Sequence, residues 1–195
     1  MMISGITGGM GCGKSTVGRL LERYGFRRLD ADALVHERVL TAPDVIETLC
    51  QRYGPSVRAA GGLIDRKELA RVVFGQEGEL KWLEELTHPR VFALWREYFA
   101  REPHARWIVE VPLLFEKGLE NWFDFTVCVA CSPHQQLARL EQRGISRGLA
   151  GQRLAKQLPL VQKIAQSDFV IWNSGSPEFL QAEVDRLAKA LISHT

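Results

Sequence analysis

The chain carries Gly8-Gly9-Met10-Gly11-Cys12-Gly13-Lys14-Ser15-Thr16 near its N-terminus, after the apolar residues Ile3 and Ile6 and before a helical pattern. It matches the G-x-x-x-x-G-K-[ST] phosphate loop, whose backbone N–H groups surround the phosphates of a nucleoside triphosphate. The glycines are needed because a backbone wrapped around an anion takes positive φ angles and leaves no room for Cβ atoms. The loop opens into a helix, and the partial positive charge of a helix N-terminus attracts the same anion. We therefore predict a nucleotide site in which Lys14 reaches the outer phosphates and the Ser15 hydroxyl enters a Mg²⁺ shell.

Composition limits the class of protein. A chain of 195 residues with 46% hydrophobic and 25% charged residues fits one globular domain with a small insertion. The net charge of +2 lacks the basic surplus typical of nucleic-acid binders. A strand pattern begins within a few residues of Met1, and no run approaches the 18 apolar residues of a membrane span. These features predict a cytoplasmic protein without a nucleic-acid or membrane partner, as a monomer or weak homo-oligomer.

The four cysteines are Cys12, Cys50, Cys128 and Cys131. Cys128 and Cys131 form a C-x-x-C pair, a spacing that also occurs in redox and metal sites. If Cys128 lies in a strand over 125–130, the odd spacing points the two side chains to opposite faces. Packing in the core is therefore the favoured interpretation, and the five histidines show no metal-ligand spacing.

Acidic residues follow the second predicted strand. The helix predicted over 15–24 carries the chain about 15 Å away from the loop, and a strand over 26–30 returns it by a similar distance. Asp30 and Asp32 should then lie at the sheet edge that holds the phosphates, where open α/β folds bind ligands. A carboxylate there would orient an acceptor hydroxyl and take its proton, for which Asp32 is our choice. The alternative is that Asp30 or Asp32 caps the helical pattern that begins at Ala33.

The segment from 33 to 101 reads as helical and lacks strand patterns. Pro43 opens a helix that stops near Gly54, and Asp65-x-x-Glu68 forms a capping box. A further helix is expected over 82–86, and another is expected to start at Pro89. About 70 residues exceed a simple crossover connection, so we expect a helical insertion over about 33–104 that holds the acceptor.

The strand pattern returns at Trp107–Val111, continuing into Pro112-Leu113-Leu114-Phe115-Glu116, and again over 125–130 and 168–172. Ser132-Pro133 and Ser176-Pro177 mark helix starts. Five strands interleaved with helices predict a doubly wound parallel α/β sheet. The core is expected over about 1–32, 105–143 and 167–195. Between them, a glycine-containing basic stretch over about 144–166 is expected to act as a mobile lid.

Further charged residues suit phosphoryl transfer. Arg139 and Arg143, four residues apart on one predicted helix face, and Arg153 would place guanidinium groups around the transferring phosphoryl, or would form a solvated basic surface. Glu110 would hold Mg²⁺ through water or would be a polar strand residue, the second being favoured.

With these residues in place, the chain resembles the dephospho-CoA kinase family. The resemblance rests on an ordered set of motifs: Thr7 to Thr16, Asp30-Ala31-Asp32, His88-Pro89, Val111 to Glu116, Arg139 and Arg143, Gln157-Leu158-Pro159 with Lys163, and Asp168 to Ile171 with Asn173 and Gly175. It implies a P-loop kinase fold and ATP- and Mg²⁺-dependent phosphorylation of the ribose 3′-hydroxyl of dephospho-CoA, the last step of coenzyme A synthesis.

The resemblance also implies roles for residues. Asp32, Lys14 and Arg139 would be catalytic. ATP would contact Gly9, Met10, Gly11, Cys12, Gly13, Lys14, Ser15, Thr16, Arg143 and Asn173. The acceptor would contact Thr7, Asp32, His88, Pro112, Leu113 and Glu116. The chain departs from the family pattern at Cys12, where the loop often has Ser, at Ser167, where Ala is usual, and in the loosely matching lid.

Two other classes compete with this interpretation. A nucleoside or shikimate kinase would share the donor residues and differ in the insertion. A nucleotide-dependent switch would need N-K-x-D, but Asn121-Trp122-Phe123-Asp124 has Trp in place of Lys.

Overall fold

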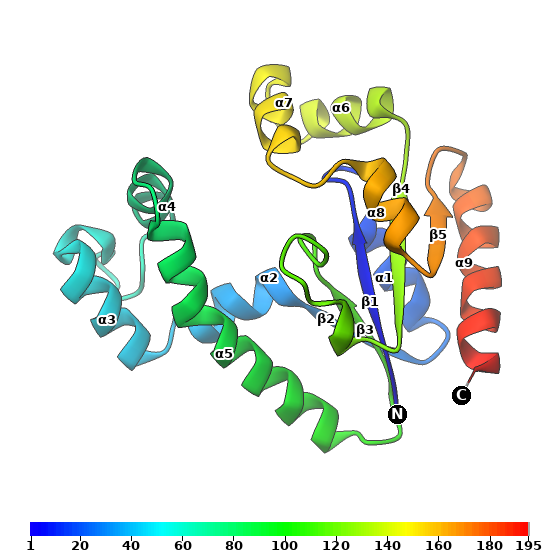
Figure 1. The fold of residues 1–195 in the computed structure, drawn as a ribbon, viewed down its shortest axis with the longest axis horizontal. Coiled ribbons are helices and arrows are strands. Elements are labelled where there is room, and N and C mark those ends of the chain that lie inside the picture. The colour runs from blue at the N-terminus through cyan, green and yellow to red at the C-terminus, as the bar shows by residue number, and fades with distance from the viewer. Residues whose placement is uncertain (195) are drawn as a thin grey trace. The chain divides into compact units, whose positions relative to one another are not determined.

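A computed structural model describes residues 1–194 of the chain (Figure 1). The chain divides into two compact units. The sheet unit comprises Met1–Asp30 and the residues from Pro103 onward, and the helical unit comprises Ala31–Glu102. The helical unit occupies nearly the same residues as the insertion expected over 33–104.

The sheet unit contains a five-stranded parallel sheet in the order β2-β3-β1-β4-β5. Its strands are β1 (Met2–Gly8), β2 (Phe26–Asp30), β3 (Arg106–Glu110), β4 (Phe125–Ala130) and β5 (Phe169–Trp172). β1 lies in the centre and is buried along nearly all of its length, as expected for a parallel strand covered on both faces. The predicted doubly wound α/β fold is confirmed.

The helices of the sheet unit connect these strands. They are α1 (Lys14–Glu22), α6 (Pro133–Gln142), α7 (Arg147–Ala155), α8 (Leu160–Gln166) and α9 (Pro177–Ser193), with a short 3₁₀ turn, η3 (Glu120–Trp122). The predicted N-caps are present, because the Ser132 and Ser176 hydroxyls accept hydrogen bonds from the backbone N–H groups of Gln135 and Phe179.

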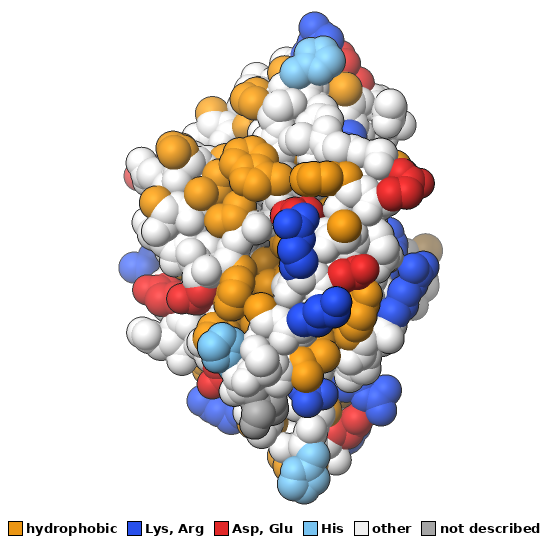
Figure 2. Space-filling view, turned by 90° about the vertical axis from the view of Figure 1, so that its right-hand side faces the viewer, with side chains coloured by type: hydrophobic (Ala, Val, Ile, Leu, Met, Phe, Trp, Pro, Cys, Tyr) orange, Lys and Arg blue, Asp and Glu red, His pale blue; other side chains and the backbone are white. Residues whose placement is uncertain are grey.

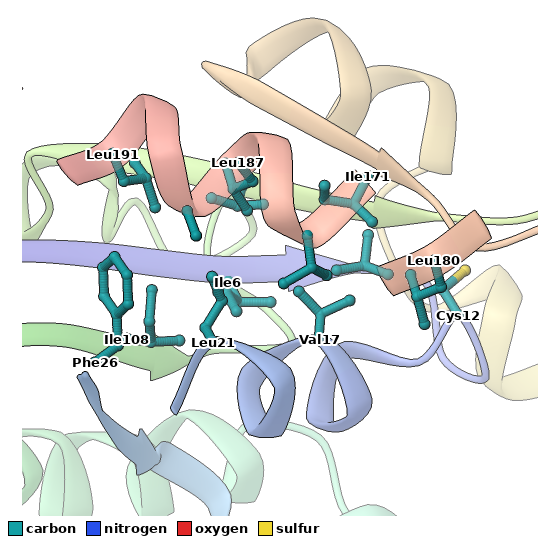
Figure 3. Packing of buried hydrophobic residues seen from close by; sticks show 14 of the residues in the cluster. Ile6, Cys12, Val17, Leu21, Phe26, Ile108, Ile171, Leu180, Leu187 and Leu191 are labelled. Atoms are coloured by element: carbon teal, nitrogen blue, oxygen red, sulfur yellow. The ribbon is translucent and has the colours of Figure 1, made fainter. Parts of the chain in front are cut away.

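One hydrophobic cluster lies between the sheet and the helices α1 and α9, which pack against each other (Figure 3). Ile6 of β1, Val17 and Leu21 of α1, and Leu187 and Leu191 of α9 point into it and are at most 4% exposed. At about 25 cal/mol per Å² of buried apolar surface, such a cluster is the main stabilising element of a unit of this size.

The opposite face of the sheet is covered by α8, which lies on β1 and β4. There Gly5 of β1 leaves room for Leu114 and Phe123, because a Cβ atom on Gly5 would come within 2.7 Å of Leu114 Cδ1 and 2.8 Å of Phe123 Cδ2. The sheet is therefore buried on both faces at its centre.

The chain after β3 differs from the expectation. β3 ends at Glu110, and the backbone N–H of Val111 adds one more hydrogen bond to the carbonyl of Ile6. Residues 112–118 then form turns instead of continuing the strand, because Lys117 and Leu119 donate back to Leu113 and Leu114. We call residues 112–118 the β3 turn.

The helical unit is built from helices and short turns. They are α2 (Ala31–Leu34), a π-helical turn η1 (Val35–Val39), α3 (Pro43–Tyr53), a 3₁₀ turn η2 (Pro55–Val57), α4 (Arg66–Gly75) and α5 (Glu79–Arg101). The predicted cap of α4 is present, since the Asp65 carboxylate accepts from the N–H groups of Lys67 and Glu68.

Pro89 does not start a helix. It lies inside α5, which runs without a break over the helix expected at 82–86 and the one expected after Pro89. Thr87, Val91, Trp95 and Phe99 are buried along one side at a spacing of four residues, so the same face packs on both sides of the proline. This packing outweighs a local cost of about 3 kcal/mol for proline in a helix.

The surface around α9 and β5 is mixed in character. Figure 2 shows Lys and Arg scattered among apolar, acidic and uncharged groups on this face. Over residues 1–194, none of the helices combines the length and the apolar composition that a membrane span requires.

Candidate active site

The phosphate loop joins β1 to α1, so it has the strand-loop-helix context that the motif requires. Two glycines make this path feasible. Gly8 has a φ of 134°, and a Cβ atom there would lie 2.1 Å from the carbonyl oxygen of Val129. Gly13 has a φ of 97°, and its Cβ atom would lie 2.3 Å from Asn173 Nδ2. Any other residue at these positions would strain the loop or displace its neighbours.

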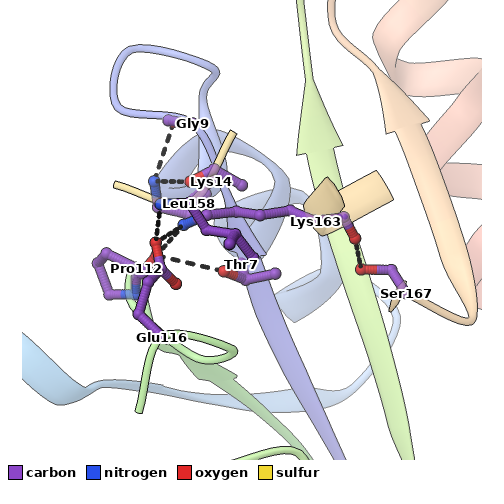
Figure 4. Close-up of polar contacts among 9 residues, drawn as sticks. Thr7, Gly9, Lys14, Pro112, Glu116, Leu158, Lys163 and Ser167 are labelled. Carbon is purple, nitrogen blue, oxygen red and sulfur yellow. Dashed lines mark hydrogen bonds and ion pairs between the residues drawn. The ribbon is translucent and has the colours of Figure 1, made fainter. Parts of the chain in front are cut away.

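Lys14 is turned back over the loop. Its Nζ donates hydrogen bonds to the carbonyl oxygens of Gly8 and Gly9, each 3.1 Å long (Figure 4). The ammonium group therefore lies on the loop, close to the backbone that would face the phosphates.

The Ser15 hydroxyl donates to Glu110 Oε2 at 2.8 Å. Glu110 is the last residue of β3 and only 3% exposed, and its other carboxylate oxygen pairs with Arg28 Nη1 of β2 at 2.7 Å. The structure thus brings together the predicted metal ligand Ser15 and Glu110. Arg28 was not expected from sequence, since a basic residue in a strand has no local signal of its partner.

Three side chains from distant segments hold the loop backbone. Asn173 Nδ2 donates to the Cys12 carbonyl at 2.8 Å, and Gln136 Nε2 donates to the Met10 carbonyl at 3.1 Å. Arg139 Nη2 donates to the Asn173 carbonyl at 2.9 Å, and its Nη1 lies 3.5 Å from the Gly11 carbonyl. Arg139 and Asn173, both predicted from the resemblance, therefore lie at the loop. Gln136 was missed, because a glutamine inside a helix carries no functional signal by itself.

A second cluster lies beside the loop, on the β3 turn (Figure 4). The Pro112 carbonyl accepts hydrogen bonds from Thr7 Oγ1 at 3.3 Å and from Lys163 Nζ at 2.8 Å. Lys163 Nζ also pairs with Glu116 Oε1 at 2.7 Å, and the Leu158 N–H donates to the same oxygen at 2.9 Å. Three predicted acceptor residues, Thr7, Pro112 and Glu116, are thus gathered around one buried ammonium group.

Lys163 corrects the expectation of a basic lid over 144–166. Its side chain is fully buried in α8, so it is part of the sheet unit's interior and not of a solvated basic surface. Residues 147–155 of the expected lid form α7, most of which is exposed.

Three further candidates are Arg143, Leu113 and His88. Arg143 is exposed and is the C-cap residue directly after α6, the helix that carries Arg139. Leu113 lies partly buried on the β3 turn. His88 is part of α5, where its ring packs on Phe92 with centroids 5.8 Å apart.

The acidic pair lies at the end of β2 and just after it. Asp30 ends the strand, in register with Glu110 of β3. Asp32 is the second residue of α2 and so is not its N-cap, whereas Asp30 directly precedes the helix, so a capping role for Asp30 stays open. The catalytic role of Asp32 stays a prediction.

Cys12 and Cys131 form a contact that was not expected from sequence. Their sulfur atoms are 3.3 Å apart, with the Cys131 thiol donating. That hydrogen bond, aided by the charge of Lys14, outweighs burial and lowers the pKa of Cys12 to about 7. The predicted opposite orientation of the C-x-x-C pair is confirmed, because Cys131 joins the cluster on the α1 side of the sheet and Cys128 does not.

The chain is similar to known proteins over most of its length. The family model described as dephospho-CoA kinase matches residues 2–178. A dephospho-CoA kinase from Thermosynechococcus vestitus is 44% identical over 184 residues, covering 93% of this chain and 91% of the relative. The crystal structure of TT1252 from Thermus thermophilus superposes with a TM-score of 0.84 at 36% identity, covering 99% of this chain and 97% of that one. The dephospho-CoA kinase structure from Campylobacter jejuni has the same fold, with a TM-score of 0.67 at 24% identity and coverage of 97% and 96%.

The family model spans most of the chain, and a relative well above 30% identity aligns over nearly its full length. The chain therefore belongs to the dephospho-CoA kinase family.

Proposed function

We propose that this protein transfers the terminal phosphoryl group of ATP to the ribose 3′-hydroxyl of dephospho-CoA, giving coenzyme A and ADP. The observation that carries the proposal is the loop between β1 and α1, with Lys14 on its backbone and Ser15 beside Glu110, in a chain of this family. Phosphoryl transfer asks little covalent chemistry of the protein, which must neutralise charge and align the acceptor.

On the donor side, the loop amides and the helix N-terminus would bind the phosphates of ATP. Lys14 would exchange its two carbonyl contacts for the outer phosphates, because a phosphate anion is a stronger partner for an ammonium group than a neutral carbonyl. Arg139 would keep the loop in shape through Asn173 and offer its charge to the transferring group. Arg143, exposed at the end of α6, would contact ATP as well.

The donor atoms present fit a magnesium ion. Ser15 and Glu110 place a hydroxyl and a carboxylate oxygen 2.8 Å apart, and Mg²⁺ prefers hard oxygen ligands. We propose that Ser15 binds the ion directly and that Glu110 contacts it through water. When bound, the ion would neutralise charge between the outer phosphates of ATP.

On the acceptor side, we propose that Asp32 orients the ribose hydroxyl and accepts its proton as the new bond forms. Asp32 follows the end of β2 by two residues, and β2 ends at the same sheet edge as β3 and Glu110. Thr7, His88 and the β3 turn residues Pro112, Leu113 and Glu116 would contact dephospho-CoA, the helical unit serving as its binding domain and residues 144–166 as the lid.

The test is an acceptor screen with purified protein, ATP and Mg²⁺, in which ADP release is coupled to a spectroscopic readout and coenzyme A is detected by chromatography. We expect turnover with dephospho-CoA and not with nucleosides or shikimate. Turnover with a nucleoside or shikimate, and none with dephospho-CoA, would overturn the proposal. Omitting Mg²⁺ should abolish turnover.

The proposal also includes a cytoplasmic location, no nucleic-acid partner and a monomeric or weakly self-associating state. Sedimentation of the purified protein over a range of concentrations measures the last of these.

A further inference from the structure

Two cysteines from distant parts of the chain meet beneath the phosphate loop. Cys12 is part of the loop, and Cys131 follows β4 directly. Their sulfur atoms are 3.3 Å apart, and both residues are free thiols with at most 1% exposure. Figure 3 shows Cys12 at one end of the hydrophobic cluster, near Leu180.

We propose that Cys12 and Cys131 form an oxidisable dithiol site, in which a hydroperoxide produces an intrachain disulfide that ties the phosphate loop to the end of β4. This site goes beyond the kinase activity, and the bond can be detected without any activity measurement.

The reaction is a two-electron oxidation in two steps. The Cys12 thiolate attacks one peroxide oxygen, the O–O bond breaks, and the other oxygen leaves as an alcohol or water after taking a proton. The resulting sulfenic acid is attacked by the Cys131 sulfur, which loses its proton as the S–S bond forms and water leaves. Each sulfur loses one electron, and the peroxide gains two.

The surroundings of the pair favour Cys12 as the first nucleophile. The Cys131 thiol donates its hydrogen bond to Cys12, and Lys14 supplies a nearby positive charge. Both stabilise a thiolate on Cys12 and lower its pKa, so Cys12 is the thiol of the pair that ionises first. Cys131 is correspondingly the thiol that keeps its proton, because the neighbouring Cys12 raises its pKa.

The phosphate loop controls the access of a hydroperoxide to the Cys12 sulfur. Gly11 and Cys12 are buried, whereas Met10 and Gly13, the next residues outward on the two sides, are only partly buried, so a hydroperoxide has to pass the phosphate loop to reach the sulfur. A hydroperoxide is small, and the second thiol is already in contact with the first. We therefore expect the disulfide to form in the folded protein.

The bond should change nucleotide binding. Sulfur atoms in a disulfide lie about 2.05 Å apart, so the two sulfurs must approach each other from 3.3 Å. The Cys12 carbonyl also accepts the hydrogen bond from Asn173, and its neighbours carry the amides of the loop. A shift of this backbone should weaken ATP binding at least roughly tenfold, because the amide positions define the anion site.

The experiment treats the native protein with hydrogen peroxide, quenches it with an alkylating agent and counts free thiols. The number of titratable thiols per chain should fall from four to two. No Lys or Arg lies between Lys117 and Arg139, so trypsin leaves Cys128 and Cys131 on one peptide. Fragmentation of the cross-linked peptide, repeated with Cys128→Ser, assigns the bond to Cys131.

Two further variants sharpen the test. Cys131→Ser, and Cys131→Ala if the serine variant folds poorly, should bind ATP normally before oxidation and form no cross-link afterwards. Cys50→Ser, in the helical unit, should behave like the native protein throughout. In the native protein, dithiothreitol should restore both the thiol count and the ATP affinity.

Four thiols remaining after oxidation would overturn the proposal, as would a bond that involves Cys50, Cys128 or a second chain. A Cys12–Cys131 bond that leaves ATP affinity unchanged would overturn its effect on the loop. None of these results depends on whether dephospho-CoA is the acceptor, so failure here is distinct from failure of the proposed function.

Discussion

Asp32 and Lys14 act on opposite sides of the proposed transfer, and single substitutions separate the two sides. Asp32→Asn keeps the size of the side chain and removes its capacity to accept a proton. We expect kcat with dephospho-CoA to fall at least roughly a hundredfold while the Kd for ATP stays about the same. Steady-state kinetics and nucleotide titration measure the two quantities.

Asp30→Asn is the matched comparison for this substitution, because Asp30 lies two residues earlier at the end of β2. A full kcat in Asp32→Asn would show that the carboxylate is not the base. A loss confined to Asp30→Asn would assign the role to the neighbour instead.

Lys14→Ala should remove turnover and weaken ATP binding together. The lysine contacts the loop carbonyls and is proposed to contact the outer phosphates of ATP. ATP binding and phosphoryl transfer should therefore both depend on it. Calorimetric titration with ATP and the ADP-release assay check the two effects. Arg19→Ala, an exposed cation on the same helix, serves as the control and should change neither.

At the scale of elements, the buried Lys163 links α8 to the β3 turn through Glu116 and the Pro112 carbonyl. Lys163→Met leaves the partly buried Glu116 carboxylate with the Leu158 N–H but without its cationic partner, so we expect the free energy of unfolding to fall by about 3 kcal/mol, the lower end of the range for a broken buried pair. Urea unfolding at neutral pH measures this loss.

The double variant Lys163→Met, Glu116→Gln tests the cause. Because it removes the uncompensated charge as well as the ammonium, it should regain a substantial part of the lost stability. The single variant Glu116→Gln is measured as well. If the double variant loses as much unfolding free energy as Lys163→Met and Glu116→Gln lose together, the ion-pair explanation is contradicted.

In the helical unit, α3 is joined to α5 by an ion pair. Arg52 donates two hydrogen bonds to Glu79, at 2.7 and 2.8 Å, and Tyr53 donates a third, at 2.6 Å. The Arg52 guanidinium also lies over the Trp82 ring, 4.2 Å from its centroid. Arg52 and then Tyr53 lower the pKa of Glu79 from 4.5 to about 2.

This shift predicts a pH dependence of stability. A carboxyl group whose pKa is lower in the folded state contributes its full stability above the unfolded pKa, near 4.5, and loses it as the pH falls through about 2. The stability difference between the native protein and Glu79→Gln should therefore be largest at pH 6–7 and shrink between about pH 4.5 and 2.

Denaturant unfolding at several pH values measures that difference. Glu85→Gln is the control, since Glu85 forms only an exposed pair with Lys81 at 3.9 Å and should show little difference at any pH. A difference for Glu79→Gln that stays constant down to pH 2 would contradict the assignment.

Local signals explain which elements were predictable. β4 occupies the predicted residues, because an apolar run bounded by turn residues is typical of a buried parallel strand. Ser132 and Ser176 cap their helices as expected. The continuous helix through Pro89 was missed because the local cost of proline is visible in the sequence, whereas the buried row on both sides of it depends on packing within the helical unit.

The candidate active site also contains residues that were predictable from local sequence and residues that only the fold brings together. The phosphate loop is a local motif, so its strand, turn and helix were predictable from a short stretch. Lys163 was assigned to a mobile lid because residues 144–166 contain several basic residues, and only the fold shows that Glu116, 47 positions earlier, neutralises it. The Cys12–Cys131 contact joins residues 119 positions apart and had no signal beyond the odd spacing of the C-x-x-C pair.

At the scale of the whole molecule, the anchoring of α8 narrows the part of the chain that could close over the substrates. Lys163 and the packing of α8 on β1 and β4 tie the end of the expected lid to the sheet unit. We propose that its movable part is the exposed helix α7, which carries Arg147 and Arg153. Arg147 already pairs with Glu141 at 2.7 Å, which leaves Arg153 as our candidate to reach the phosphates.

Closure of α7 should suppress the hydrolysis of ATP, because water competes with the ribose hydroxyl for the phosphoryl group. We expect acceptor-independent ADP release to be slow in the native protein. Arg153→Ala should slow transfer to dephospho-CoA and raise the ratio of hydrolysis to transfer at least roughly tenfold. Measuring ADP release with and without dephospho-CoA gives this ratio directly, and Arg147→Ala, which removes only the pair with Glu141, should leave it near the native value. Equal ratios of hydrolysis to transfer in the native protein and Arg153→Ala would contradict this role of α7. They would indicate that the bound acceptor, and not α7, keeps water away from the phosphoryl group.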